Sequence, residues 1–150
     1  MKALATNRYV RHEYEVLDTF DAGMMLTGQE VKSIKNGAIS LKGAHVIVRN
    51  SQAWLLNATV SPYPQAGPLP DYDPTRSRKL LLNSSEIERI AGGLSRDRLT
   101  VVPLEVYTHR GLVKIKIALA RGKKEYEKRE TIKKREVTRE VQRTIREDSR

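Results

Sequence analysis

The feature that most restricts the fold of this chain is an alternation of apolar and polar residues across LTVVPLEVYTHRGLVKIKIALA, residues 99–120. In the second half of this stretch, Lys114 and Lys116 alternate with aliphatic residues, which is the period of a β-strand with one apolar face. The sequence His109-Arg110-Gly111 between the two halves is typical of a tight turn. The stretch therefore predicts a β-hairpin.

Weaker versions of the same pattern predict further strands nearer the N-terminus. One strand is expected from about Tyr14 to Leu26, with a bulge or bend at residues 21–23. Residues 44–48 and 53–60 are expected to form a second hairpin, because a turn-forming segment separates them. Residues 1–7 are expected to form a flexible N-terminus.

Two segments predict short helices, and one predicts a long loop. Thr27 and Glu30 have the spacing of a capping box at a helix start, and Asn36-Gly37 would end that helix. A second helix is expected to begin near residues 83–85 and to stop at Gly92-Gly93. Between the second hairpin and this helix, residues 61–74 contain five prolines, and they predict a surface loop.

About six short antiparallel strands with two helices between them suit one small domain. The chain has 150 residues, which is the usual size of a single domain. The predicted fold is mainly β, a small antiparallel barrel of the oligonucleotide-binding type with two or three short helices. Residues 8–120 would form this barrel, and residues 121–150 would form a basic C-terminal tail.

The tail looks helix-prone but cannot join a core. Residues 121–150 carry 12 basic and 7 acidic residues, and the residue types are mostly good helix formers. The aliphatic residues after Tyr126 are too few for a helix that packs on a globular core. We expect a tail that is disordered when free and that orders on a polyanion. The alternative is a charged extension that only aids solubility.

The residue types that most enzymes and metal sites require are absent or scattered. The chain has no cysteine, and His12, His45 and His109 lie far apart without metal-ligand spacing. No phosphate-loop or hydrolase motif occurs. We therefore predict no enzyme, no metal site and no cofactor. No segment approaches the roughly 20 apolar residues of a membrane span, and no signal peptide is visible, so a cytoplasmic protein is expected.

The net charge of +10 indicates a polyanionic partner. Three stretches, NRYVRHEY, EVKSIKNG and DPTRSRKLLL, place basic residues beside apolar or aromatic ones. Basic groups on a rigid scaffold suit phosphate contacts, and rings that can stack on unpaired bases are offered by Tyr9, His12 and Tyr14. RNA or DNA binding is favoured over a merely solvated surface. A membrane-surface role is disfavoured because the apolar stripe of the tail is thin.

Four motifs, NRYVRHEY, GQEVKSIKNG, DPTRSRKLLL and ARGKKEYEKR, resemble those of the SsrA-binding protein family, also called small protein B or SmpB. They run from about Asn7 to Arg129 in the order and spacing of that family. The resemblance implies an oligonucleotide-binding type barrel with added helices. The sequence departs from the family pattern at Val10, Ile34 and Glu127, where Ala, Leu and Asp are common.

The resemblance implies a specific function. Members of this family bind transfer-messenger RNA (tmRNA) at its tRNA-like domain and deliver it to stalled ribosomes for trans-translation and peptide tagging. The protein mimics the anticodon arm, and its tail probes the empty mRNA channel at the decoding centre and becomes helical there. A monomer, one per RNA, is expected. The alternatives are a structural ribosomal protein, a general single-stranded RNA-binding protein, and a metal-independent ribonuclease using His12 and Glu30.

The resemblance also implies which residues serve each partner. The tmRNA-binding set comprises Asn7, Arg8, Arg11, His12, Glu30, Lys32, Ser33, Lys35, Arg76, Arg78 and Lys79. For the last three, a role in bracing the barrel stays open. The ribosome-binding set in the tail comprises Gly122, Lys123, Lys124, Tyr126, Glu127, Lys128 and Arg129.

Overall fold

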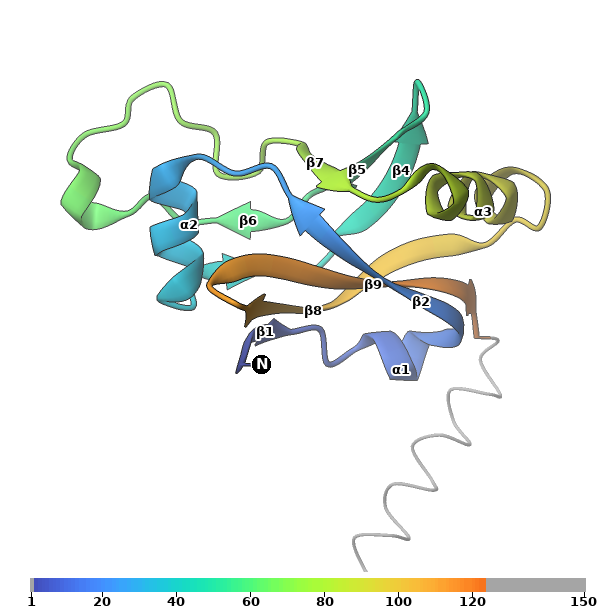
Figure 1. The fold of residues 1–150 in the computed structure, drawn as a ribbon. Coiled ribbons are helices and arrows are strands. Elements are labelled where there is room, and N and C mark those ends of the chain that lie inside the picture. Colours follow the sequence, from blue (N-terminus) through green and yellow to red (C-terminus); the bar gives the residue numbers. More distant parts are fainter. Residues whose placement is uncertain (1, 124–150) are drawn as a thin grey trace, which may run out of the picture.

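The computed structural model describes residues 2–123, apart from the side chains of Lys2 and Arg11. Within this range the chain forms a mainly antiparallel β structure with three short α-helices (Figure 1). The strands are β1 (Lys2–Thr6), β2 (Tyr14–Met24), β3 (Ile39–Ser40), β4 (His45–Arg49), β5 (Gln52–Leu56), β6 (Thr59–Val60), β7 (Arg78–Leu81), β8 (Thr100–His109) and β9 (Leu112–Gly122). The helices are α1 (Val10–Glu13), α2 (Gly28–Lys35) and α3 (Ser84–Ser95), with a 3-10 turn η1 at Pro64–Ala66.

The strands close into a ring, which confirms the predicted fold class. The main sheet has the order β1-β8-β4-β5-β7-β2-β9, and β8 also pairs with β9, so the strands from β8 round to β9 form a closed, barrel-like circuit. The hairpin β8–β9 is the one that the alternation over residues 99–120 predicts. Strands β4 and β5 form the second predicted hairpin, with Asn50 and Ser51 at positive φ in its turn.

The interior of the ring holds one large apolar core. Its fully buried side chains include Ile34 from α2, Ile90 from α3 and Ile115 from β9, so two helices contribute to the same core as the strands. A second, smaller cluster lies apart from it and joins Val10 of α1 to Val102, Ala118 and Ala120. This cluster fixes α1 against β8 and β9.

The prediction of a flexible N-terminus is wrong for residues 2–6. These residues form β1, which pairs with β8 from Lys2 opposite Thr108 to Thr6 opposite Glu105. Strand β4 pairs with β8 only at Val101, so the rest of that edge of β8 would have unpaired backbone groups. Strand β1 supplies the missing partner.

Two strand predictions need smaller corrections. The irregularity in β2 lies between Val16 and Asp18 and not at residues 21–23. The expected strand 53–60 is divided, because Asn57 adopts a positive φ of 64° and redirects the chain. The part after this bend is β6, which pairs with β3.

The second predicted helix does not stop at Gly92-Gly93. Helix α3 continues to Ser95, and Gly93 is buried where the helix meets the Leu119 side chain of β9. A Cβ on Gly93 would lie 2.7 Å from Cδ1 of Leu119, so this glycine allows close packing and does not end the helix.

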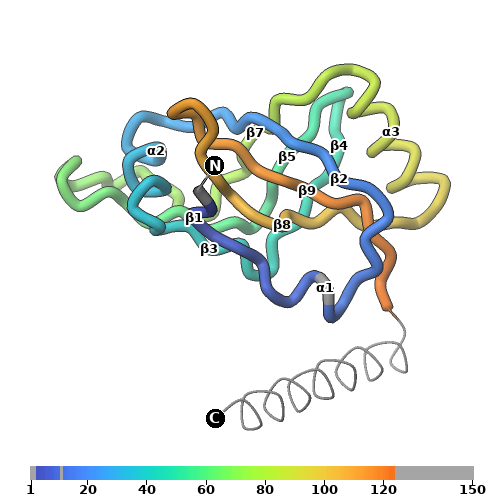
Figure 2. The backbone as a smooth tube through the Cα atoms, turned by 60° about the horizontal axis from the view of Figure 1, so that its bottom comes forward, coloured from blue at the N-terminus to red at the C-terminus, as the bar shows by residue number. Residues whose placement is uncertain are grey.

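Strand β9 extends past the expected domain boundary at residue 120, to Gly122. Figure 2 shows that its last residues and α1 lie at the same end of the molecule. Within residues 2–123 no helix is long and apolar enough to cross a membrane.

Candidate nucleic-acid interface

Helix α2 begins with the capping box that the sequence predicts. The Glu30 amide donates to Oγ1 of Thr27 at 3.3 Å, and the Thr27 amide donates to Oε1 of Glu30 at 2.9 Å. The two bonds satisfy backbone groups that the first turn of a helix leaves unpaired. This fixes where α2 starts and therefore which of its side chains face water.

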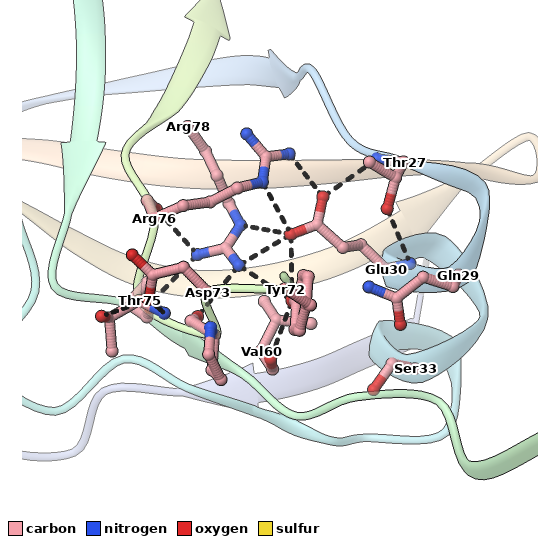
Figure 3. Close-up of polar contacts among 12 residues, drawn as sticks. Thr27, Gln29, Glu30, Ser33, Val60, Tyr72, Asp73, Thr75, Arg76 and Arg78 are labelled. Atoms are coloured by element: carbon pink, nitrogen blue, oxygen red, sulfur yellow. Dashed lines mark hydrogen bonds and ion pairs between the residues drawn. The ribbon is translucent and has the colours of Figure 1, made fainter. Parts of the chain in front are cut away.

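The same carboxylate is the centre of a buried polar network (Figure 3). Arg78 donates to Oε2 of Glu30 from Nε at 3.0 Å and from Nη2 at 2.7 Å, and neither side chain is exposed. Arg76 donates to both carboxylate oxygens, from Nε to Oε2 at 3.1 Å and from Nη2 to Oε1. The hydroxyl of Tyr72 donates to Oε2 at 3.1 Å. One carboxylate thus joins α2 to the residues just before and within β7.

The network keeps Glu30 ionised. Burial alone would raise the pKa of its carboxyl group. Hydrogen bonds from Arg76, from the Thr27 amide and from Arg78 outweigh burial, so the pKa falls from 4.5 to about 2. The group is a permanent acceptor near neutral pH, which suits a structural role and does not suit a general base.

Arg78 ties the network to the proline-rich loop. Its Nη1 donates to the carbonyl of Ala58 at 3.0 Å, and its Nη2 donates to the carbonyl of Pro74 at 3.0 Å. Arg76 differs, because 34 % of its side chain is exposed. Ser33 is also buried, and its hydroxyl donates to the carbonyl of Ser61 at 2.5 Å.

Three members of the predicted tmRNA-binding set are buried in this structure. Glu30, Ser33 and Arg78 have no more than 2 % of their surface exposed, so they cannot touch RNA in this conformation. They hold α2 and the loop at residues 61–74 together. The residues around Glu30 and Ser33 did not predict this burial, because the partner Arg78 lies 48 residues from Glu30.

The outer face of α2 remains accessible. Lys32 and Lys35 are exposed on α2, and Nζ of Lys32 lies 5.7 Å from the centre of the Tyr63 ring. The Tyr63 amide donates to Oε1 of Gln29 at 3.0 Å, which docks the loop on the helix. Lys79 is partly buried on β7, opposite Trp54.

A second group of predicted residues surrounds α1. Asn7 is partly buried; its side chain donates to the carbonyl of Pro103 at 3.2 Å and its amide to the carbonyl of Leu104 at 2.8 Å. Arg8 is exposed, and His12 is half-buried. The side chain of Arg11 lies outside the described part of the structure.

A groove of about 670 Å³ lies beside α1. Its walls include Tyr9 and Tyr14, two of the rings predicted to stack on bases, together with Lys42 and His45. Sequence reasoning missed Lys42 altogether and treated His45 only as an isolated histidine, because no motif links them to α1. A smaller groove, lined by residues 4–9 and 39–42, extends from this region over β1.

Most of the predicted ribosome-binding residues of the tail lie outside the part of the chain that the structure describes. Gly122 ends β9, and the Lys123 amide donates to the carbonyl of Glu13 at 2.8 Å. The other five members, Lys124, Tyr126, Glu127, Lys128 and Arg129, lie outside the described residues.

Comparison with known proteins decides the family. A family model described as SmpB protein matches residues 4–147, nearly the whole chain. The chain belongs to the SmpB family. The match includes most of the tail, so the SmpB resemblance is not confined to the barrel.

Individual members of the SmpB family are similar to this chain along nearly their full length. The SsrA-binding protein of Trichodesmium erythraeum (strain IMS101) is 47% identical over 146 residues, which is 97% of this chain and 94% of the relative. That of Enterococcus faecalis (strain ATCC 700802 / V583) is 45% identical over 149 residues, covering 99% and 96%. A solved structure described as "tmRNA-SmpB: a journey to the center of the bacterial ribosome" is similar at 40% identity and a TM-score of 0.66, covering 81% of this chain and 85% of the other.

Proposed function

We propose that this protein binds the tRNA-like domain of tmRNA and delivers it to stalled ribosomes for trans-translation. The observation that carries the proposal is that the chain is similar to the SmpB family along nearly its whole length. It is also similar to a solved structure whose description names tmRNA, SmpB and the bacterial ribosome. In this role the barrel stands where the anticodon arm of a tRNA would be. One monomer acts per RNA, and the protein contributes binding and not catalysis.

The tmRNA-binding residues divide into contacting and supporting groups. The contacting group consists of the basic or aromatic members that are at least partly exposed, Arg8, His12, Lys32, Lys35, Arg76 and Lys79, together with Arg11, which the family pattern adds. Arg76 also bonds Glu30. The supporting group consists of Asn7, Glu30, Ser33 and Arg78, whose polar groups bond other parts of the protein. Basic side chains fix the register on phosphates, and rings stack on unpaired bases.

The tail would serve the ribosome. It carries a net charge of +5 over residues 121–150, which suits a narrow channel lined by RNA phosphates. Lys123, Lys124, Tyr126, Lys128 and Arg129 would contact the decoding centre, and the segment would become helical there.

The selectivity of RNA binding tests the proposal that the protein binds the tRNA-like domain of tmRNA. The full chain is titrated with the isolated tRNA-like domain of tmRNA and with an RNA duplex of equal charge. We expect a one-to-one complex with the tRNA-like domain at least tenfold tighter than with the duplex. Equal affinity for the two RNAs would refute selective tmRNA binding.

Tyr126→Ala tests the proposed contact between the tail and the ribosome. If the ring stacks on a ribosomal base, its loss weakens the ribosomal step by about 1–3 kcal/mol. Tagging of a peptide on a ribosome stalled without a stop codon should fall, while affinity for free tmRNA stays unchanged. A variant that tags normally would exclude a stacking role for Tyr126.

A further inference from the structure

The end of strand β9 bonds directly to α1. The amide of Lys123 donates to the carbonyl of Glu13 at 2.8 Å. Glu13 is the last residue of α1, and the next residue, Tyr14, pairs with Gly122. The bond therefore extends the β2–β9 ladder by one step onto the helix. Figure 2 shows α1 and the end of β9 at the same end of the fold.

Helix α1 needs outside support. It has four residues, and a single helical turn is unstable alone because nucleation costs more than one hydrogen bond returns. The carbonyls of its last residues also have no partner within the helix. The Lys123 amide satisfies one of them, the carbonyl of Glu13.

Three anchors hold α1 and the residues before it. Asn7 bonds the carbonyls of Pro103 and Leu104 before the helix begins, and Val10 inserts into the small apolar cluster on β8 and β9. The Lys123 amide bonds the C-terminal end of α1. The first two anchors belong to the barrel, whereas the third is the residue from which the tail departs.

A nearby ion pair adds little to the third anchor. Arg121 bonds the carboxylate of Glu15 on the neighbouring strand, but both side chains are about half exposed, at 49% and 48%. Exposed pairs of this kind are screened by water and contribute weakly. The backbone bond of Lys123 is a direct link between α1 and the end of β9.

We propose that the Lys123 amide is a positioning group for the RNA-binding helix α1, and that RNA binding in turn strengthens the bond between Lys123 and Glu13 at the end of β9. This inference rests on the proposed function, because it takes α1 as a tmRNA contact. It follows from reciprocity: a bond that favours the RNA-competent form of α1 must itself be strengthened when RNA selects that form.

Positioning and direct contact have different signatures. If the Lys123 amide only keeps α1 formed, its loss lowers the population of the competent state and raises the apparent Kd by the same factor. The number of phosphates neutralised in the complex is unchanged, so the dependence of log Kd on log salt keeps its slope. Loss of a contacting side chain reduces that slope by about 0.7–0.9.

A pair of substitutions in the full chain isolates the backbone bond. Lys123→Pro removes the lysine side chain and the amide hydrogen, while Lys123→Ala removes the side chain beyond Cβ and keeps the amide hydrogen; Gly122 before the proline is already extended, as proline requires. We expect the proline variant to bind the tRNA-like domain about three- to tenfold more weakly than the alanine variant, with equal salt slopes. Equal Kd values would overturn the proposal, and so would a smaller slope for the proline variant.

Amide hydrogen exchange provides a test that needs no substitution. Exchange at Lys123 in the wild-type chain should slow when the tRNA-like domain is added in excess. Unchanged exchange in the bound complex would overturn the coupling. Wild-type binding is measured in the same experiments, so failure of the proposed function, seen as no selective RNA binding, is distinguished from failure of this inference, seen as binding without an effect at Lys123.

Discussion

Arg78 and Glu30 form an ion pair inside the protein, with 2.7 Å between Nη2 and Oε2 and neither side chain exposed to water. The pair connects β7 to α2, which carries the exposed Lys32 and Lys35. Buried charges are costly unless they are paired and fully hydrogen-bonded. Here the Arg78 guanidinium also bonds three backbone carbonyls, so its donors are well satisfied.

Arg78→Met should destabilise the fold strongly. It leaves Glu30 without its fully buried partner, although Arg76 and Tyr72 remain, and removing one member of a buried pair typically costs about 3–5 kcal/mol. Urea unfolding followed by circular dichroism gives the free energy. Arg89→Met is the matched control: it breaks the Arg89–Asp18 pair, but Arg89 is 67% exposed, so the loss should stay below about 1 kcal/mol. Similar losses of unfolding free energy in the two variants would contradict a stabilising role for the buried Arg78–Glu30 pair.

Acid should weaken the fold through Glu30. Its pKa is about 2 in the folded protein against 4.5 ordinarily. Because the folded pKa is lowered, the stabilisation is fully present above about pH 4.5 and is lost as pH falls toward 2. It amounts to about 3 kcal/mol. Free energies of unfolding between pH 6 and 2 should show this loss in the wild type and lack that component in Glu30→Gln. Parallel pH profiles would refute the lowered pKa.

The sequence predicted features that depend on neighbouring residues. Alternation across residues 99–120 was sufficient for the β8–β9 hairpin, and the Thr27–Glu30 spacing was sufficient for the capping box. Both arise from contacts between residues close in the chain, which a local pattern can encode.

Features that depend on distant partners were missed. Strand β1 exists because the edge of β8 needs a partner, and Glu30 is buried because Arg78 lies opposite it. Neither partner is visible from the residues around Lys2–Thr6 or Glu30. The family motifs identified Glu30 and Arg78 as important, but the motif does not distinguish a side chain that touches RNA from one that supports its neighbours.

The two adjacent glycines of α3 should respond differently to alanine. Alanine in a helix is favoured over glycine by about 0.8–1.0 kcal/mol. At Gly92 the added Cβ meets only the end of the Arg96 side chain, which is exposed and can move, so Gly92→Ala should stabilise by up to that amount. At Gly93 it meets Leu119, which is buried, and overpacking costs about 1–3 kcal/mol. The melting temperature of Gly92→Ala should therefore be higher than that of Gly93→Ala. The reverse order would exclude close packing of Gly93 against Leu119.

Lys32 and Ser33 are neighbours on α2 that should affect RNA binding in different ways. Lys32 is exposed, whereas Ser33 is buried and bonds the carbonyl of Ser61. Lys32→Ala should weaken binding to the tRNA-like domain and reduce the slope of log Kd against log salt by about 0.7–0.9, because the proposed phosphate contact is lost. Ser33→Ala should leave that slope unchanged and lower the free energy of unfolding by about 1 kcal/mol.

A control for general charge completes this test. Arg49→Ala removes an exposed basic residue at the end of β4, beside the β4–β5 turn, which Figure 1 shows away from both α1 and α2. Its salt slope should match that of the wild type. If Arg49→Ala lowered the slope as much as Lys32→Ala, the RNA would be held by overall charge and not by a defined surface at α2.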